Sequence, residues 1–410
     1  MPPQTLFDLV DTLRRQKDLF RLILSPDMQF GSASAPRLGA ELLPEYTRNK
    51  NAWTETQVRY RTTLARPTAD FSPPILDKSG RLVGSFDVRL GTSSRASSME
   101  AQDIEELNEL LNLANQRSDT RLSDEALLRM YNWYDRELMQ PIQDYNELQR
   151  WQAICDGEVE RQIAEAPIGA SPTAGRQKVV YPYFEGQRLP VPSGTTANPA
   201  GWYATMQSAQ PYYDPLLDLI GVKRYLATKG YRLRRIISAY DPWLRFQQHP
   251  GIRARFQNLQ FQTGSQVGTA RLYQNSVSAA QVNQLLVDND LPPFEVYDRT
   301  FNYRDLDGSI HYGRYLERET YFPIVFVCDT ERMQMIDLGD RPTLELENTL
   351  GYYAIGRVMG HSQEGRVINT EVQDRRHPPS VYGEVIQMGL PVITEPESFA
   401  VLQIQKPTKV

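Results

Sequence analysis

The sequence predicts a mixed α+β fold with more than one compact domain, and three observations support this. Two strand-like segments come early, a long helical region follows, and the second half alternates short helices with short strands. At 410 residues, the chain is longer than one hydrophobic core usually serves. Hydrophobic residues make up 40% and charged residues 23%, as in ordinary globular domains.

The two early strands predict a long hairpin. Residues Gln57–Leu64 alternate between β-branched or aromatic and polar side chains, and Arg81–Leu90 forms a second such run after a turn at Asp77–Gly80. Charged side chains fall on both faces of this hairpin. Since an isolated hairpin is marginal in water, we expect it to lie on another surface.

The helical region spans about 97–157. Ser97 and Glu100 have the spacing of a capping box at the start of a first helix. A second helix is expected from Ser123 to Gly157, and Pro141 within it predicts a kink. Its apolar residues recur every third or fourth position: Leu127, Tyr131, Tyr134, Leu138, Ile142, Tyr145, Leu148, Trp151 and Cys155.

The second half reads as alternating helices and strands. One helix is expected to start at Asp214-Pro215 and to stop at Gly230. Another starts at Asp241-Pro242 and runs to about Gln257, and a third is capped by Ser278 with Gln281. Strands are expected at 233–238, 294–303, 310–316, 324–328, 381–388 and 399–404. We expect a common core from Leu216, Leu219, Ile220, Ile236, Ile237, Leu285, Val325 and Val327.

The first 52 residues are expected to form an arm. A short amphipathic helix is expected at Leu6–Leu24, and Ser25–Arg37 has the composition of a linker. The sequence starts without the basic and apolar stretches of a secretion signal, and it contains no run of 18 apolar residues. We therefore expect synthesis in the cytoplasm and no association with a membrane.

No motif in the chain predicts catalysis, so we expect a protein that is not an enzyme, with no catalytic residue, bound metal or cofactor. The four histidines, His249, His311, His361 and His377, lack the spacing of a zinc site. Phosphate-binding loops and nucleophile elbows are also missing from the sequence. The segment Asp305–Gly308 resembles the start of a calcium loop, although a hairpin turn explains it. A metal-dependent nuclease or glycosidase that uses Asp305 and Asp307 is the enzymatic rival.

The two cysteines, Cys155 and Cys328, stand far apart in the sequence. A reducing compartment favours two buried free thiols over a disulfide between them. The bulk charge of −5 gives no general attraction to nucleic acid. Basic clusters at Arg232–Arg235 and Arg253–Arg255 could touch a polyanion, but surface solvation or ion pairs between subunits are the favoured interpretation.

Charge is unevenly distributed along the chain. Residues 53–95 contain 7 basic and 4 acidic side chains, a net of +3, whereas residues 96–165 contain 6 basic and 16 acidic ones, a net of −10. A basic hairpin and an acidic helical region are complementary docking surfaces, within one molecule or between molecules. The candidate contact residues are Arg59, Arg61, Arg66, Arg81 and Arg89 on the hairpin and Glu105, Glu106 and Glu109 on the first helix.

Several short motifs in this order resemble one family of proteins. They are Arg235–Trp243, with its strand and Asp-Pro turn, then Phe294–Tyr297, Asp307-Gly308, Tyr321–Pro323, Met335–Gly339 and Val385–Ile404. The sequence from about residue 50 to 404 resembles the lambda-type branch of tailed-bacteriophage major capsid proteins, which have the Hong Kong 97-type capsid fold. Residues 1–50 and 177–201 have no motif that matches.

The resemblance implies a division of the chain into named parts. These are an N-terminal arm (1–52), an extended E-loop hairpin (53–95), a P-domain with the spine helix (96–212), an A-domain (213–375) and strands that return to the P-domain (376–410). It also implies a virion protein that self-assembles into pentamers and hexamers of an icosahedral head around double-stranded DNA, without sequence-specific binding. Portal, scaffold and decoration proteins would be its partners. An encapsulin-like shell or another virion component is the structural alternative.

Overall fold

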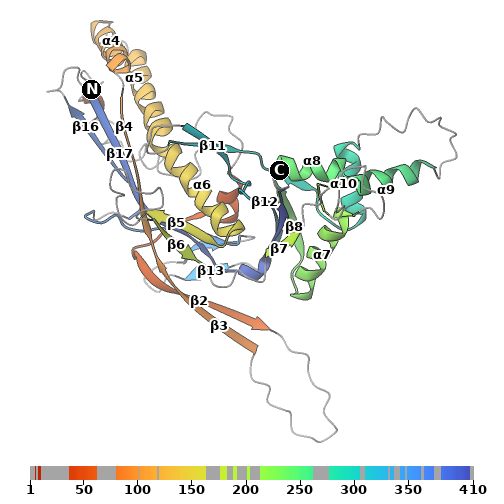
Figure 1. Cartoon of the computed structure of the whole chain (residues 1–410). Coiled ribbons are helices and arrows are strands. Elements are labelled where there is room, and N and C mark those ends of the chain that lie inside the picture. Colours follow the sequence, from red (N-terminus) through yellow and green to blue (C-terminus); the bar gives the residue numbers. More distant parts are fainter. Residues whose placement is uncertain are drawn as a thin grey trace, which may run out of the picture. The chain divides into compact units, whose positions relative to one another are not determined.

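The computed structural model describes residues 5, 8–10, 37–61, 80–99, 101–117, 120–162, 176–181, 188–191, 201–203, 213–261, 277–304, 310–330, 333–336, 342–346, 349–361, 364–373 and 380–406. The chain forms two compact units and is mixed helix and sheet, as predicted (Figure 1). Unit 1 consists of Met1–Met28, Glu45–Met139 and Tyr353–Thr394, and unit 2 of Gln29–Pro44, Gln140–Tyr352 and Glu395–Val410. Each unit is therefore assembled from three separate stretches of sequence.

The main sheet of unit 1 is organised around one long strand, β17 (Ser380–Ile393). The strand order is β1 (Glu45–Thr47), β15 (Gly351–Ile355), β17 and β16 (Val367–Gln373), and β4 (Gly91–Ser98) also pairs with β17. In β4, Ser97 lies opposite Gly383. The predicted capping box at Ser97 is therefore wrong, because this residue belongs to a strand and the following helix begins at Ala101.

The predicted hairpin is present in unit 1 as β2 (Ala52–Arg61) and β3 (Gly80–Arg89). The strands are antiparallel and pair from Ala52 opposite Arg89 to Arg61 opposite Gly80. Neither strand pairs with any other strand in the described part of the chain. Val88 and Leu90 are buried at the base of the hairpin. The expected turn at Asp77–Gly80 lies outside the described residues apart from Gly80, the first residue of β3.

Three consecutive helical segments confirm the predicted long helix. They are α5 (Thr120–Trp133), the π-helical segment η1 (Tyr134–Met139) and α6 (Gln140–Cys155), and a separate helix α4 (Ala101–Arg117) precedes them. The long helix begins at Thr120, slightly before the expected start at Ser123. Most of its predicted apolar stripe is buried, including Tyr131, Tyr134, Leu138, Ile142, Trp151 and Cys155.

Unit 2 contains a five-stranded sheet in the order β7 (Arg188–Val191), β18 (Phe399–Gln405), β12 (Tyr321–Cys328), β8 (Leu233–Ser238) and β9 (Phe294–Val296). The central strand β12 is antiparallel to both neighbours. Helices α7 (Pro215–Thr228), α8 (Tyr240–Gln248), α9 (Pro250–Phe261) and α10 (Ala279–Asp288) gather beside this sheet (Figure 1). The late strand β18 thus belongs to the same sheet as β8 and β12.

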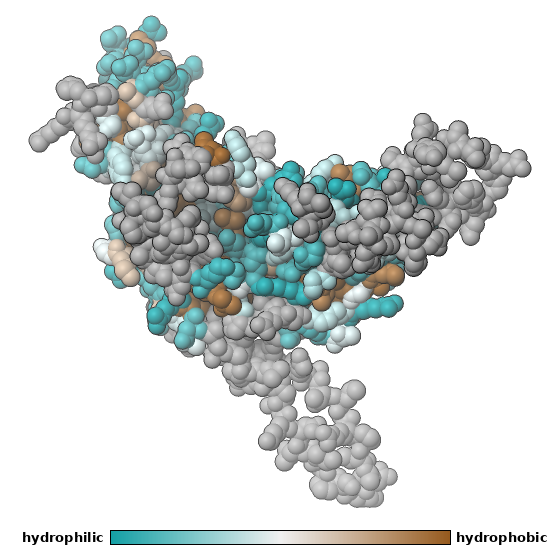
Figure 2. All heavy atoms as spheres, viewed as in Figure 1, coloured by the Kyte–Doolittle hydropathy of each residue, from teal (hydrophilic) through white to brown (hydrophobic). Residues whose placement is uncertain are grey.

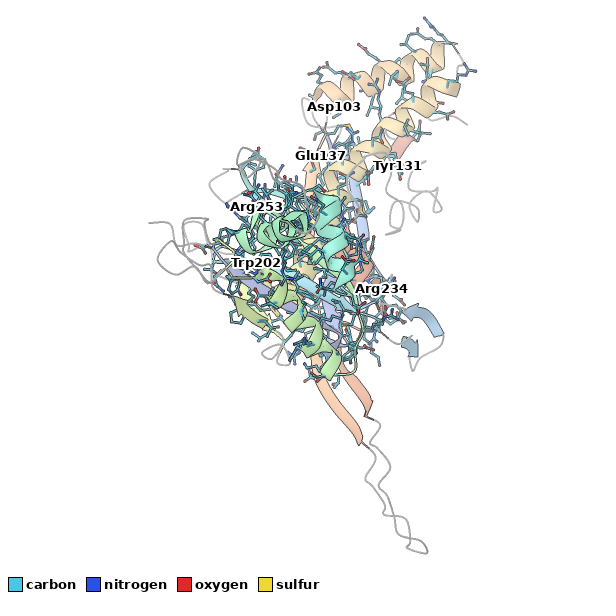
Figure 3. All side chains as sticks on the ribbon, turned by 90° about the vertical axis from the view of Figure 1, so that its right-hand side faces the viewer. Asp103, Tyr131, Glu137, Trp202, Arg234 and Arg253 are labelled. Carbon is cyan, nitrogen blue, oxygen red and sulfur yellow. The ribbon has the colours of Figure 1, made fainter. Side chains whose placement is uncertain are left out.

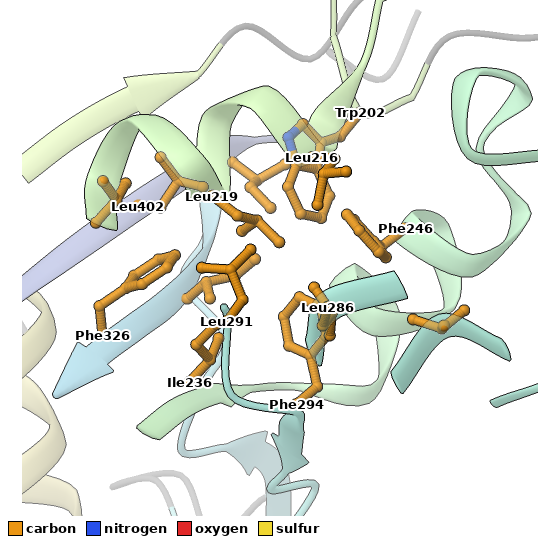
Figure 4. Close-up of a cluster of buried hydrophobic side chains, with 14 of the residues drawn as sticks. Trp202, Leu216, Leu219, Ile236, Phe246, Leu286, Leu291, Phe294, Phe326 and Leu402 are labelled. Atoms are coloured by element: carbon orange, nitrogen blue, oxygen red, sulfur yellow. The ribbon is translucent and has the colours of Figure 1, made fainter. Parts of the chain in front are cut away.

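A cluster of buried side chains fills the space between this sheet and its helices (Figure 4). Leu216, Leu219 and Ile236 of the expected core belong to it, and the half-buried Ile220 and Leu285 pack against it. Ile237, Val325 and Val327 are also buried, but outside this cluster. The expected residues are thus buried or half-buried, as predicted, but they do not share one interior. Because successive residues of a strand face opposite sides of a sheet, the sheet is buried on both faces.

The start signals of two helices act as predicted. The Asp214 side chain accepts a hydrogen bond from the Leu216 backbone N–H at 3.1 Å, and both hydrogen bonds of the capping box at Ser278 and Gln281 are present. The prediction of a single helix from Asp241 to Gln257 is wrong, because the structure has two helices there, α8 and α9. His249 has extended backbone angles between α8 and α9, because a residue that precedes a proline disfavours the helical region.

The remaining described elements are small. They are α3 (Leu38–Leu42), β5 (Glu158–Gln162), β6 (Arg176–Val180), β10 (Thr300–Arg304), β11 (Ile310–Arg314), β13 (Met333–Ile336), β14 (Pro342–Leu346) and η4 (Pro396–Ser398). Of the predicted helix Leu6–Leu24, only 8–10 are described, and these are helical. No helix in the described ranges is long and apolar enough to cross a bilayer.

Candidate functional site

The structure describes the basic half of the predicted docking pair only in part. Arg89, in the last position of β3, is exposed. Arg59, Arg61 and Arg81 lie on the paired strands β2 and β3, but their side chains are outside the described set, as is all of Arg66. The contact role of these five arginines therefore remains a prediction.

The acidic half lies on α4, where Ile104, Leu107, Leu111 and Ala114 are buried. Glu105, Glu106 and Glu109 are exposed on this helix. Arg129 of α5 forms ion pairs with Glu106 at 2.7 Å and with Glu125 at 3.2 Å, all between exposed side chains. Such pairs contribute about 0–1 kcal/mol and stay accessible to a competing partner.

The surface of the α4–α5 pair is mainly hydrophilic in the visible view (Figure 2). Asp103 lies on α4 and Glu137 on η1, in the same helical part of unit 1 (Figure 3). Two hydrophobic side chains, Leu113 and Leu128, are exposed there. An acidic surface with scattered apolar side chains suits a partner that carries arginines on long aliphatic stems.

Part of the acidic surplus is used inside unit 2 and is unavailable to a partner. Asp144 on α6 forms ion pairs with Arg37 at 2.9 Å and with Arg299 at 3.0 Å. Asp156, at the end of the same helix, forms an ion pair with Arg318 at 2.6 Å and accepts a hydrogen bond from the Tyr321 hydroxyl at 2.5 Å. The net charge of −10 for residues 96–165 therefore overstates the charge that α6 can offer.

Glu147 forms a fully buried polar site in unit 2. Its side chain is fully buried, and Oε1 accepts hydrogen bonds from the Gly39 N–H at 2.8 Å, Trp151 Nε1 at 2.8 Å and the Tyr297 hydroxyl at 2.9 Å. Arg150 approaches Oε2 at 3.5 Å. Burial, followed by the negative charge of Glu147, raises the pKa of Tyr297 well above its usual value. This site was not predicted from the sequence, although the polar residues 146, 147, 149 and 150 interrupt the apolar repeat there and are all buried.

The basic clusters of the second half form ion pairs within unit 2. Arg235 bonds to Glu295 at 2.7 Å and to Glu41 at 3.1 Å, and Arg234, labelled in Figure 3, lies 3.8 Å from Asp329. Arg255 forms an ion pair with Asp214. Arg234, Arg235 and Arg255 are therefore ion-paired within unit 2, and ion pairs of these clusters with other subunits remain a prediction.

A second polar cluster joins α7 to the segment around residue 202. Asp218 accepts hydrogen bonds from Trp202 Nε1 at 2.8 Å and from the Tyr213 hydroxyl at 2.6 Å. Burial raises the pKa of Asp218, although the two hydrogen bonds oppose this shift. Trp202 is itself almost fully buried and belongs to the hydrophobic cluster, so this carboxylate anchors the core.

His249 is held in one tautomer at the break between α8 and α9. Its Nδ1 accepts a hydrogen bond from the Gly251 N–H at 3.1 Å, and Nε2 lies 3.1 Å from the carbonyl oxygen of Gly201. A neutral ring with its proton on Nε2 satisfies both contacts. Burial lowers the pKa of His249, which favours this neutral form.

Cys155 and Cys328 are both free and buried, as predicted. Burial raises the pKa of each thiol to about 12, so neither is a reactive thiolate at neutral pH. In the described ranges, no group of three or more His, Cys, Asp and Glu side chains could hold a metal. Asp305, Asp307 and the predicted turn between β10 and β11 lie outside the described residues.

No protein-family model and no curated protein matches the sequence. The chain is similar to the solved structure of a putative capsid protein of a prophage from E. coli CFT073, with 14% identity, coverage of 95% of this chain and 98% of that one, and a TM-score of 0.49. It is similar to a phage-related protein from Bordetella bronchiseptica RB50, with 12% identity, coverage of 94% and 96%, and a TM-score of 0.44. A third similar structure is an encapsulin complex from Synechococcus elongatus PCC 7942, with 10% identity, coverage of 95% and 95%, and a TM-score of 0.37.

Proposed function

We propose that the chain is a major capsid protein with the Hong Kong 97-type fold, which assembles into pentamers and hexamers of an icosahedral phage head. The hairpin β2–β3 is the observation that carries this proposal. It pairs ten residues on each strand, and neither strand pairs with another described strand of its own chain. Because a two-stranded ribbon is marginally stable alone, a support from a neighbouring subunit explains why so long a hairpin exists.

The order of the elements supports the same proposal. The hairpin is followed by the helical region α4–α6, then by the α/β sheet of unit 2, and finally by β17 and β18. This is the order of E-loop, spine helix, A-domain and return strands in the family that the sequence motifs resemble. The domain ranges given above are part of the proposal.

Charge supports containment of DNA without tight binding. The chain has a net charge of −5, and the arginines of unit 2 with described ion pairs are neutralised by their own carboxylates. A shell lining of this kind gives little counterion release on contact with DNA. We propose that the protein encloses double-stranded DNA without sequence specificity, is made in the host cytoplasm and resides in the virion.

A structural role also fits the chemistry of the described polar clusters. Asp218, His249 and Glu147 each bind groups of their own chain through hydrogen bonds that hold buried segments together. We propose that the protein is not an enzyme and needs no cofactor. Portal, scaffold and decoration proteins would be separate partners in the assembled head.

Negative-stain electron microscopy of the purified, nuclease-treated protein tests the proposal. Closed shells of regular diameter are expected, either spontaneously or when the head genes are co-expressed. Rings or tubes would instead indicate a portal or tail component, and small closed shells that exclude DNA would indicate a cellular compartment. A monomer that hydrolyses a polymer only with a divalent metal would support the enzymatic rival.

A further inference from the structure

We infer that residues 37–43 form a strap that docks on α6, and that the buried carboxylate of Glu147 is the clamp that holds it there. The strap contains α3, and both the strap and α6 belong to unit 2.

The clamp joins three elements that are far apart in the sequence. Glu147 Oε1 accepts three hydrogen bonds. They come from the Gly39 N–H of the strap, the indole N–H of Trp151 one turn along α6, and the hydroxyl of Tyr297 after β9. Hydrogen bonds to a charged acceptor are roughly twice as strong as neutral ones. One carboxylate oxygen therefore fixes the strap to two parts of unit 2 at once.

The strap is shaped to fit this carboxylate. A Cβ atom at residue 39 would lie 2.8 Å from Oε2 and 2.9 Å from Oε1 of Glu147, closer than real Cβ contacts allow. Only glycine lets the backbone approach closely enough for the N–H to reach the carboxylate. Gly39 and Glu147 thus form a matched pair.

Other contacts support the docked strap on both sides of Gly39. Arg150 Nε donates to the Leu43 carbonyl at 3.0 Å, the Leu350 N–H donates to the Leu42 carbonyl at 2.9 Å, and Arg37 pairs with Asp144. Leu38, Leu42 and Leu43 are buried. Glu41, in contrast, pairs with Arg235 through a half-exposed side chain.

Docking and the clamp depend on each other. With five residues, α3 is too short to be a stable helix alone, so its conformation requires the docked contacts. In turn, a buried carboxylate is costly when it loses donors. Glu147 Oε2 has no hydrogen-bond partner in the described structure and is compensated only by the Arg150 guanidinium at 3.5 Å. Loss of the hydrogen bond from the Gly39 N–H would therefore destabilise the charged carboxylate of Glu147, and loss of that charge would release the strap.

Hydrogen–deuterium exchange of the full-length protein tests the clamp. In Glu147→Gln, exchange of the amides in 38–43 should accelerate roughly ten- to a hundredfold, the effect of one lost charged hydrogen bond. Trypsin should also cleave after Arg37 faster than in the wild type. The matched control is Glu41→Gln, which removes an exposed carboxylate from the strap itself and should leave exchange nearly unchanged.

Gly39→Ala tests the same contact from the strap side and leaves Glu147 intact. It should accelerate exchange in 38–43 while α7 and β8 keep their wild-type protection. Wild-type protection of 38–43 in both Glu147→Gln and Gly39→Ala would overturn the inference. Loss of protection throughout unit 2 in both variants would also overturn it, since Glu147 would then be a general core residue and not the clamp of a strap.

Discussion

The side chain of Arg95 on β4 donates a hydrogen bond from Nε to the backbone carbonyl oxygen of Glu137 at a distance of 3.3 Å. In an α-helix, this carbonyl would receive the N–H of residue 141, which is a proline and has none. The π-helical segment η1 ends at Met139, directly before this proline. A strand side chain thus donates to a carbonyl that Pro141 would leave without a donor in a regular α-helix.

We expect Pro141→Ala to restore the missing N–H and to straighten the helix, whose bend at this position remains a prediction. The consequence should be a changed particle diameter in electron micrographs, with little change in the melting temperature of the subunit. Particles of wild-type diameter would show that Pro141 does not influence shell curvature.

Arg95→Met should cost about 0.5–1.5 kcal/mol of unfolding free energy, because it removes the donor but keeps the aliphatic stem. In the Pro141→Ala background, the same substitution should cost less, since the helix then supplies its own donor. Urea unfolding of the four proteins in this cycle measures the coupling. Equal costs in both backgrounds would show that Arg95 does not substitute for the missing N–H.

Shortening the hairpin should abolish shell closure without unfolding the subunit. Because Val88 is buried at the base, the variant removes Val58–Val83 and joins Gln57 to Gly84, which are direct partners, through Asn-Gly. Circular dichroism should show a folded protein and micrographs should show no closed shells. Normal shells from this variant would refute an assembly role for the hairpin.

Single arginines on the hairpin should matter little. Arg59→Ala should change assembly only slightly, because one exposed ion pair contributes about 0.2–1 kcal/mol. The many copies in a lattice act together, so assembly yield should fall with ionic strength. Light scattering across a salt series measures this; a yield that is insensitive to salt would argue against charge pairing at the contact.

His249 should make the protein less stable in mild acid. Its pKa is lowered by burial in the folded state, so the unfolded chain binds the proton first as pH falls below the usual 6.5. Stability is therefore full above that pH and declines below it, by at most about 1.4 kcal/mol per pH unit. In His249→Asn, which keeps an acceptor for Gly251, unfolding free energies between pH 7.5 and 5.5 should change less. An identical pH dependence in both proteins would assign the effect to other groups.

The sequence predicted the local features of the fold well and the distant ones poorly. The caps at Asp214 and Ser278 depend on residues two or three positions away, and both were found as expected. Strand β4, Gly91–Ser98, was missed because its small polar residues have low strand propensity. It is a strand because it pairs with β17, almost 300 residues later in the chain.

The buried polar site could not be predicted for the same reason. Glu147 receives hydrogen bonds from residues 108 positions earlier and 150 positions later, so no local spacing marks it. In contrast, Glu105, Glu106 and Glu109 were chosen from helical periodicity and charge, and they are exposed on α4 as that pattern implies. Their contact with the hairpin of a neighbouring subunit remains a prediction, because a contact between two chains produces no characteristic residue spacing within either chain.

Zero-length cross-linking in assembled particles tests the central claim that the hairpin lies on an acidic helix of a neighbour. Lys78 is the only lysine in residues 53–95, and a carbodiimide would join its amine to nearby carboxylates. Particles assembled from equal amounts of ¹⁴N and ¹⁵N subunits distinguish the two kinds of contact by mass spectrometry. We expect peptides that join Lys78 to Glu105, Glu106 or Glu109 and carry mixed isotopes in about half of the cross-links. Cross-links with one isotope only would show that the hairpin docks on its own chain, and would contradict the claim.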